Sequence, residues 1–200
     1  NGEQLRNRVL TDTFEPGSTM KPLTIAAALE KGVITPNTNM AIGAKYLVGP
    51  KPITDTHTYD KLTVSQIIQK SSNIGTAKIA MNNLTAEEMW DFYMSVGFGQ
   101  APKIGFPGAV SGTLHPYKKW MPTDQARISF GYGISSSLFQ VARAYTVFAR
   151  DGELVPLTIE RSPKFKPGIQ VLSPKTAIAV RSMLETVTET GGTALNARAD

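Results

Sequence analysis

Cysteine is absent from this chain of 200 residues, and histidine occurs only twice. The lack of cysteine excludes a disulfide framework, a thiol nucleophile and a cysteine-ligated zinc site. The two histidines, His57 and His115, lie far apart in the sequence and match no metal-ligand spacing. We therefore expect no metal ion and no other cofactor.

Long apolar runs and concentrated charge are also missing. No run reaches the roughly 18 apolar residues that a membrane-spanning helix needs, and the first residues, NGEQLRNRVL, lack the apolar centre of a signal peptide. The 21 Lys and Arg and the 16 Asp and Glu residues are scattered, with a formal net charge of +5. The densest basic run, YKKW at 117–120, is too short to indicate a nucleic-acid partner.

What is present is the composition of a globular, helix-rich domain, with 41% hydrophobic and 18% charged residues. Periodicity and capping patterns predict helices at residues 18–31, 62–70, 73–83, 85–97, 135–152 and 173–190. Short strands are expected at 45–49, 52–56, 154–161 and 168–173. The helix at 135–152 is expected to bury an apolar face made of Leu138, Val141, Ala142, Tyr145 and Phe148.

Residues 98–122 form a long segment that is rich in glycine and proline and has no helical or strand pattern. Loops of this length inside a compact domain are usually functional or packed against the rest of the domain. Large apolar side chains recur along it, at Phe98, Phe106, Leu114, Tyr117 and Trp120. Burying each of them contributes on the order of 1.5–3 kcal/mol, so we expect an irregular but packed segment.

The stretch FEPGSTMKPLTIAAALEKG places a lysine, Lys21, three residues after a serine, Ser18, at the start of a predicted helix. Residues three apart lie on one face of a helix, so the lysine can reach the serine hydroxyl. A serine needs an adjacent base to become a nucleophile, and an unperturbed lysine is neutral in only roughly one molecule in 2,500 at pH 7. The pair predicts an activated serine only if burial lowers the lysine pKa.

Taken alone, a Ser-x-x-Lys spacing is common and a serine at a helix start is usually a cap. A second element changes the interpretation, because QKSSNIG follows with Ser71, Ser72 and Asn73, 53 residues after Ser18. It lies between two predicted helices. The serine hydroxyl can relay a proton and the asparagine amide can hold a substrate carbonyl.

Four blocks of the sequence together resemble one protein family. They are RNRVLTDTFEPGSTMKP, LTVSQIIQKSSNIGTAKIA, ISFGYGISSSLFQVARAYTVFARDGELVPL and ETGGTALNARA. They look like the transpeptidase domain of class B penicillin-binding proteins, and most like the septal, penicillin-binding protein 3 type of Gram-negative bacteria. The motifs characteristic of this superfamily are Ser-x-x-Lys, then Ser-x-Asn, then Lys-[Ser/Thr]-Gly. The resemblance extends over essentially the whole chain.

The resemblance implies an α+β fold of the serine penicillin-recognising (β-lactamase/transpeptidase-like) type, with a helical subdomain on an antiparallel sheet. Carried onto this sequence, Ser18 is the acylated nucleophile, Lys21 its base, Ser71 the relay to the leaving D-alanine, and Asn73 the ligand of the acyl amide. The Ser18 backbone N–H supplies half of an oxyanion hole. Tyr132, in the GYG segment, is expected to pack beneath the site rather than to contact the substrate.

The same resemblance implies the substrates, the inhibitors, the partners and the location of the protein. The substrates are peptidoglycan stem peptides ending in D-Ala-D-Ala, and β-lactams are covalent inhibitors. Divisome membrane proteins are expected partners, with no nucleic acid among them. The expected location is the periplasmic face of the bacterial inner membrane, with an anchoring N-terminal helix outside this chain.

The chain departs from the family at one point, because no Lys-[Ser/Thr]-Gly sequence occurs in it. In the family that motif soon follows a GGT segment like the one at Gly191 to Thr193, and the chain ends at Asp200. We therefore interpret residues 1–200 as a single, partial transpeptidase domain, an internal fragment with an incomplete sheet, and expect it to be inactive alone.

Two other functions remain open at this level. A class D β-lactamase or β-lactam sensor shares Ser-x-x-Lys, although such proteins typically carry Ser-x-Val where this chain has Asn73. A non-catalytic divisome interaction module would keep the fold without the reaction, and the missing third motif favours it. The intact first two motifs argue against that module.

Overall fold

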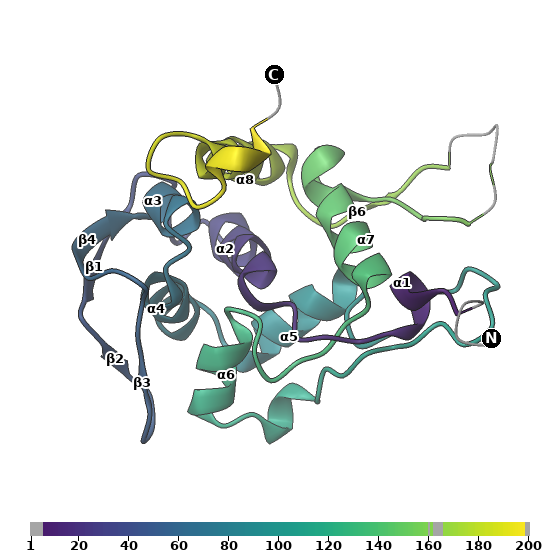
Figure 1. Ribbon diagram of the computed structural model, residues 1–200, viewed down its shortest axis with the longest axis horizontal. Coiled ribbons are helices and arrows are strands. Elements are labelled where there is room, and N and C mark those ends of the chain that lie inside the picture. The colour runs from purple at the N-terminus through teal and green to yellow at the C-terminus, as the bar shows by residue number, and fades with distance from the viewer. Residues whose placement is uncertain (1–5, 160, 162–165, 199–200) are drawn as a thin grey trace.

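The computed structural model describes residues 6–159, 161 and 166–198, and these form a helix-rich domain (Figure 1). The α-helices are α1 Arg8–Thr11, α2 Lys21–Glu30, α3 Val64–Gln69, α4 Asn73–Asn83, α5 Ala86–Ser95, α6 Pro122–Ile128, α7 Leu138–Ala149 and α8 Pro174–Glu185. The 3₁₀ helices are η2 Gly17–Met20, η3 Tyr117–Lys119, η4 Thr186–Thr188 and η5 Leu195–Ala197. The strands are β1 Asn39–Gly43, β2 Tyr46–Leu47, β3 Pro52–Ile53, β4 Tyr59–Thr63, β5 Glu153–Leu154 and β6 Ile169–Gln170.

Helix α2 is the centre of the domain, and α3, α4, α5 and α8 pack around it (Figure 1). Seven of its ten residues are buried. Its sequence, KPLTIAAALE, is apolar on nearly every side, which is typical of a helix enclosed by others rather than lying on a surface. The helix that carries Lys21 is therefore anchored in the core by contacts on several sides.

A buried polar cluster joins α2 to two neighbouring helices. The Thr24 hydroxyl donates to the carbonyl oxygen of Ser129 at 2.6 Å and lies 2.6 Å from the hydroxyl of Tyr93. Burial raises the pKa of Tyr93 well above its ordinary value, so its hydroxyl stays protonated and can donate. Because every member has a partner, the cluster positions α5 and the end of α6 against α2 without an unpaired polar group.

The strands form three separate two-stranded antiparallel sheets among the described residues. β1 pairs with β4, β2 with β3, and β5 with β6. The expectation of helices with an antiparallel, incomplete sheet is confirmed. The strands expected at 45–49 and 52–56 are present as the short β2 and β3, whereas β1 and β4 were not expected because their sequences do not alternate clearly.

Helix positions agree with the sequence better than helix ends do. The capping boxes at Thr63, Thr85 and Ser137 start α3, α5 and α7. The predicted end of the last helix, at residue 190, is wrong, because α8 ends at Glu185 and only the short 3₁₀ helix η4 follows it. The strand expected at 154–161 is reduced to Leu154 in β5, and residue 160 lies outside the described residues.

The apolar face expected for α7 is wrong in part. Leu138 and Ala142 are exposed, while Phe148 is buried and three residues outside that face, Gln140, Ala144 and Val147, are buried as well. The observed buried face thus combines three apolar side chains with one polar one, Gln140, whose amide contacts three backbone carbonyl groups inside the domain.

The segment 98–122 is largely irregular and packed, as expected. Phe98 is buried, and the other four large apolar side chains of the segment are half-buried. Its polar anchor is Gln140, whose amide nitrogen contacts the carbonyl oxygens of Gly97, Gln100 and Ser111 at 3.2, 3.0 and 2.8 Å. One buried glutamine on α7 therefore holds the start and the middle of the long segment.

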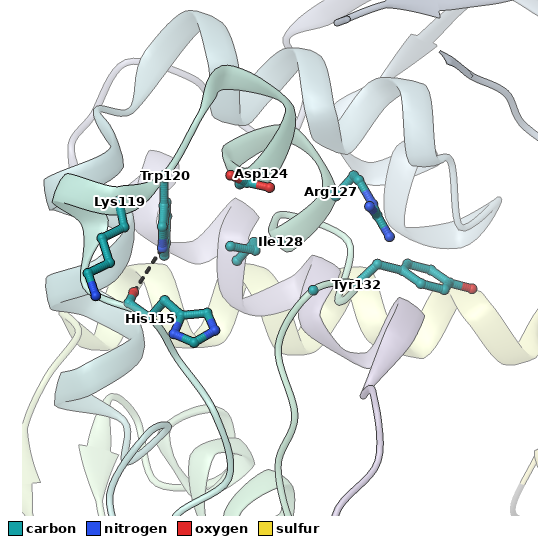
Figure 2. A pocket seen from close by; sticks show the side chains of 8 residues that line it. His115, Lys119, Trp120, Asp124, Arg127, Ile128 and Tyr132 are labelled. Atoms are coloured by element: carbon teal, nitrogen blue, oxygen red, sulfur yellow. Dashed lines mark hydrogen bonds between the residues drawn. The ribbon is translucent and has the colours of Figure 1, made fainter. Parts of the chain in front are cut away.

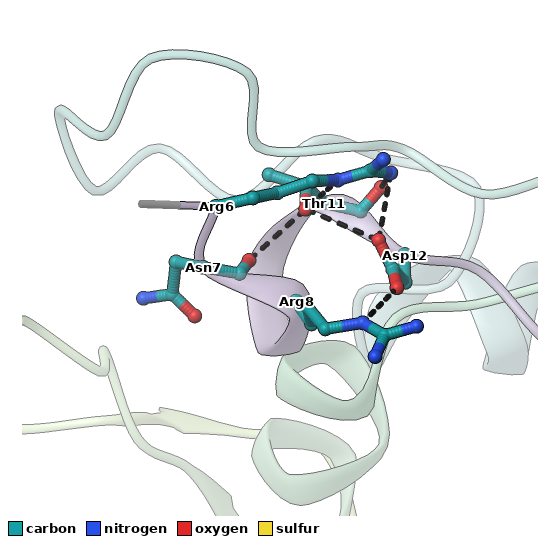
Figure 3. A network of polar contacts seen from close by, with 5 residues as sticks. All are labelled: Arg6, Asn7, Arg8, Thr11 and Asp12. Atoms are coloured by element: carbon teal, nitrogen blue, oxygen red, sulfur yellow. Dashed lines mark hydrogen bonds and ion pairs between the residues drawn. The ribbon is translucent and has the colours of Figure 1, made fainter. Parts of the chain in front are cut away.

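The chain near its N-terminal end carries an exposed ion-pair network (Figure 3). Asp12 accepts from Arg8 at 2.9 Å and pairs with Arg6 at 2.7 Å, and the hydrogen bond from Arg8 lowers the pKa of the Asp12 carboxyl. Exposed pairs of this kind contribute little to stability. Within the described residues, no helix has the length and apolar character needed to cross a membrane.

The Gln140 contacts predict a large effect of one substitution. Gln140→Ala leaves one buried and two part-buried carbonyl groups and the buried Ser137 N–H without this partner, which should lower the free energy of unfolding by about 2–4 kcal/mol. Chemical denaturation measures this. The matched control is Gln66→Ala, which removes the same capping-box bond from an exposed site on α3 and should cost about 1 kcal/mol or less. Equal effects of the two substitutions would contradict the anchoring role.

Candidate active site

The Ser18–Lys21 pair is brought together by a tight helical turn. Ser18 lies in the 3₁₀ helix η2, which runs directly into α2. Residues i and i+3 of a 3₁₀ helix lie almost directly above one another. As a result the Lys21 Nζ atom is 2.9 Å from the Ser18 Oγ atom, with the serine exposed and the lysine buried.

The second expected serine reaches the same lysine from another element. Lys21 Nζ lies 2.8 Å from Ser71 Oγ and 2.6 Å from the Ser71 carbonyl oxygen. Ser71 connects α3 to α4 in a left-handed backbone conformation with φ of 54°. At such a helix C-terminus glycine is the usual residue, and another residue there costs free energy. The strained position therefore carries a hydroxyl that a glycine would lack.

Burial changes the acid–base character of Lys21. Loss of contact with water lowers its pKa to about 8, while the negative charge of Asp55 acts in the opposite direction. At pH 7 roughly one molecule in ten then carries a neutral amine, far more than for an exposed lysine. A neutral amine has two hydrogens and one lone pair. It can donate to the Ser71 carbonyl and accept the Ser18 hydroxyl proton.

Asp55, which sequence reasoning missed, holds the Ser71–Asn73 turn in place. Its carboxylate accepts the Ser72 hydroxyl at 2.6 Å and the backbone N–H groups of Asn73 and Ile74 at 2.6 and 3.0 Å. These N–H groups begin helix α4, where an acidic side chain is favourable. No local pattern in the sequence indicates this role, because Asp55 precedes Asn73 by 18 positions.

Asn73 faces the same cleft as the three other expected site residues. Its side-chain nitrogen donates to the Thr54 carbonyl oxygen at 3.2 Å, and this contact orients the amide. Ser18, Lys21, Ser71 and Asn73 all line one cavity of about 560 Å³. All four residues chosen from the sequence are thus close together in space.

The expectation for Tyr132 is wrong, because this residue also lines the cleft and is 43% exposed. The neighbouring glycine does pack beneath the site: a Cβ atom at Gly131 would overlap the backbone of Gly17. Gly17 N–H donates to the Gly131 carbonyl oxygen at 3.0 Å, and Gly133 N–H donates to Glu15 at 2.8 Å. The GYG segment therefore supports the turn before Ser18 and directs Tyr132 into the cavity.

The far wall of the cleft is the segment Gly191 to Thr193, together with Lys70 and His57. Lys70 Nζ donates to the Gly191 carbonyl oxygen at 2.7 Å, which fastens this segment beside the Ser71 turn. The cleft therefore combines an exposed serine hydroxyl, a buried amine, a second hydroxyl and an amide. Among the described residues no group of His, Asp and Glu side chains is placed to hold a metal ion.

This chemistry agrees with the comparisons. Residues 1–200 match the family model described as penicillin binding protein transpeptidase domain. The chain belongs to that family, whose serine penicillin-recognising fold it shares.

Three relatives illustrate the similarity. The chain is 46% identical over its full length to 50% of a protein of Neisseria flavescens named probable peptidoglycan D,D-transpeptidase PenA. It is 35% identical over 95% of its length to 32% of the peptidoglycan D,D-transpeptidase FtsI of Escherichia coli. The apo structure of the TP domain of Burkholderia pseudomallei penicillin-binding protein 3 superposes with a TM-score of 0.93 at 52% identity, over 98% of this chain and 60% of that one. The chain thus spans between about a third and a half of these two curated relatives.

The strained serine predicts a separation of stability from activity. Ser71→Gly removes the left-handed strain and should keep or raise the free energy of unfolding, by up to about 1 kcal/mol. It also removes the hydroxyl, so acylation of Ser18 by penicillin should slow by about 10²–10⁴-fold. Ser71→Ala is the control, because it loses the hydroxyl but keeps the strain. Unimpaired acylation of both variants would exclude a role for the hydroxyl.

The pKa of Lys21 predicts the pH dependence of Ser18 acylation. The lysine is a base only when neutral, so the rate should rise with pH and level off above about pH 8. Asp55→Asn removes the charge that raises this pKa, and the midpoint should move to lower pH even if the maximal rate falls. Stopped-flow measurement with a fluorescent penicillin across neutral and alkaline pH gives the midpoint.

Ser72→Ala is the control for that experiment. It removes one hydrogen bond to Asp55 but leaves the carboxylate charge in place. The midpoint of its pH profile should match that of the unsubstituted protein. A midpoint that stays constant in Asp55→Asn, or that moves to higher pH, would show that Asp55 does not act on Lys21.

Proposed function

We propose that the protein containing this chain is a septal peptidoglycan D,D-transpeptidase that works through an acyl-enzyme on Ser18. The observation that carries the proposal is the position of the Lys21 Nζ atom, 2.9 Å from the Ser18 hydroxyl and 2.8 Å from the Ser71 hydroxyl. A buried amine between two hydroxyl groups is suited to take a proton from one and to exchange it with the other. The names of the relatives PenA and FtsI support the same reaction.

In the first half of the reaction Ser18 Oγ attacks the carbonyl carbon of the penultimate D-alanine, and its proton passes to Lys21. Collapse of the tetrahedral intermediate breaks the peptide bond, and the proton returns through Ser71 to the leaving D-alanine amine. In the second half an amine of another stem peptide attacks the ester and releases Ser18. Asn73 holds the acyl amide throughout, and the Ser18 backbone N–H is one oxyanion donor.

The remaining wall of the site belongs to the same proposal. The segment Gly191 to Thr193 already lines the cleft, so residues that follow it in the parent protein are well placed to complete it. We assign to them the Lys-[Ser/Thr]-Gly motif, which would bind the substrate carboxylate and supply the second oxyanion N–H. Residues 1–200 are then one part of a single transpeptidase domain.

The biological setting follows from the same family. The protein would act at the periplasmic face of the inner membrane of a bacterium, anchored by a helix outside this chain. It would cross-link stem peptides at the septum and contact divisome membrane proteins. β-Lactams, which resemble the D-Ala-D-Ala terminus, would acylate Ser18 and block it.

Covalent capture of penicillin tests the function. The full-length protein should gain the mass of one penicilloyl group, on the peptide that contains Ser18, and Ser18→Ala should gain none while keeping its thermal unfolding temperature. The 200-residue chain alone should react at least about 10²-fold more slowly, because the Lys-[Ser/Thr]-Gly motif to which we assign the second oxyanion donor does not occur in it. An adduct on the Ser18→Ala variant would refute the assignment of the nucleophile.

The lifetime of the adduct decides between the two kinds of serine acyl-enzyme. A transpeptidase stays acylated for many minutes, whereas a class D β-lactamase hydrolyses the ester and turns penicillin over. Absence of any adduct on the folded full-length protein would instead favour the non-catalytic interaction module.

A further inference from the structure

A second cavity, of about 550 Å³, adjoins the Ser18 cleft and shares Asn73 and Tyr132 with it. It lies between the β2–β3 hairpin and helix α6. Its lining is Val48, Pro50, Lys51, Pro52, Ile53, Thr54, Asn73, Thr123, Arg127, Phe130 and Tyr132. A ligand that extends from Asn73 away from Ser18 would enter this cavity.

The cavity has built walls. The turn of the β2–β3 hairpin touches α6, because a Cβ atom at Gly49 would overlap the Thr123 side chain, and Gly49 has a positive φ of 83°. Ile53 and Phe130 are buried beneath the cavity and form part of the core. The hairpin on one side and α6 on the other are therefore held at a defined separation by contacts at the rim and by the core below.

The charges of this cavity are all of one sign. Lys51 and Arg127 are its charged lining residues, and no Asp or Glu lines it. No hydrogen bond or ion pair of the Arg127 guanidinium occurs with any described residue. Asp124, on the same helix, lines a neighbouring cavity together with Arg127, but one of its oxygens accepts the Met121 N–H at 2.9 Å. Arg127 thus remains available to an external carboxylate.

Arg127 is also fixed relative to the catalytic cleft. Its carbonyl oxygen accepts the N–H groups of Phe130 and Tyr132 at 3.2 and 3.1 Å, at the end of α6. In Figure 2 the Arg127 side chain points downward and the Tyr132 side chain points to the right, and both lie on the opposite side of the view from His115. The backbone of Arg127 is thus hydrogen-bonded to the backbone of Tyr132. A ligand that contacts Tyr132 in the Ser18 cleft therefore also lies near the Arg127 side chain.

We propose that this cavity selects acyl donors that carry a carboxylate on the acyl side of the scissile bond, and that Arg127 is the specificity-determining residue that binds it. The inference rests on the proposed function, in which Asn73 holds the acyl amide and the donor chain continues past it. Arginine presents paired N–H donors that match a carboxylate. Lys51 on the opposite wall adds a second positive charge, and the apolar floor accepts the methylene groups of the donor.

Matched donors isolate the charge from everything else. The probes are N-acyl-D-alanyl thioesters whose acyl group is succinyl, glutaryl or adipyl, each compared with its monoamide of the same shape. Release of thiol by the full-length protein gives kcat/KM for every donor. With the unsubstituted full-length protein, kcat/KM for at least one acid should be about fivefold higher than for its amide, as expected for an ion pair that is not fully buried. This acid-to-amide ratio should fall as salt is added.

Arg127→Gln should bring that ratio to about one, and Arg127→Lys should retain part of it. Lys51→Gln should lower it by less, because lysine lacks the paired donors. Lys61→Gln is the control, since it removes one positive charge from exposed β4, outside the cavity, and should leave the ratio unchanged. Thermal unfolding of each variant shows whether it is folded. If Arg127→Gln does not fold, Arg127→Lys and Lys51→Gln still test the cavity.

Each outcome decides the inference. A charge preference that survives in Arg127→Gln, an equal loss in Lys61→Gln, or a parent protein that shows no preference for any acid would overturn it. The proposed function fails separately, when neither the thioesters nor penicillin acylate Ser18 at all. Acylation without a charge preference would leave the transpeptidase in place and remove only the carboxylate-selecting cavity.

Discussion

The burial of Lys21 is the constraint on which the rest of the structure depends. An amine removed from water must be satisfied by neighbouring oxygens, and here these are the Ser18 hydroxyl and the hydroxyl and carbonyl of Ser71. The same burial lowers its pKa to about 8, so the neutral base becomes accessible near neutral pH. The side chain of Lys21 thus contacts both serine hydroxyl groups and couples two segments that are 50 residues apart.

The surrounding fold keeps this arrangement from relaxing. Helix α2 is enclosed by other helices and cannot shift to expose its lysine. Asp55 fixes the turn that bears Ser71 and moderates the pKa of Lys21 through its charge. The cost of the site is visible at Ser71, which occupies a backbone conformation that favours glycine. Strain of this kind persists where packing on both sides determines the backbone, as the ends of α3 and α4 do here.

Tyr132 links the catalytic cleft to the rest of the ligand-binding surface. It lines the Ser18 cleft and the cavity beside Arg127, and the glycine before it packs on the turn that precedes Ser18. The geometry of the nucleophile and the position of this aromatic wall are therefore set by one close backbone contact. A change that separates Gly17 from Gly131 would disturb both at once.

Local patterns in the sequence determined much of this protein. The Ser-x-x-Lys and Ser-x-Asn spacings, read with their helical context, identified Ser18, Lys21, Ser71 and Asn73, because those contacts depend on turn geometry and on a family order of motifs. The capping pattern of Thr85 and Glu88 located the start of α5, since a cap and its partner are three residues apart. The spacing within each motif is short-range information, whereas the expectation that the two motifs meet rested on the family resemblance.

Tertiary structure alone decided what depends on distant segments. Asp55 and Tyr132 belong to the site because the chain returns to it, and no local pattern marks either residue clearly. Gln140 is buried although it is polar, because three carbonyl groups of a remote segment need its amide. The pKa of Lys21 likewise follows from how completely its neighbours exclude water from it. Burial is a property of the packed domain, so the sequence could indicate which residues meet in the cleft but not the environment that lowers the pKa of Lys21.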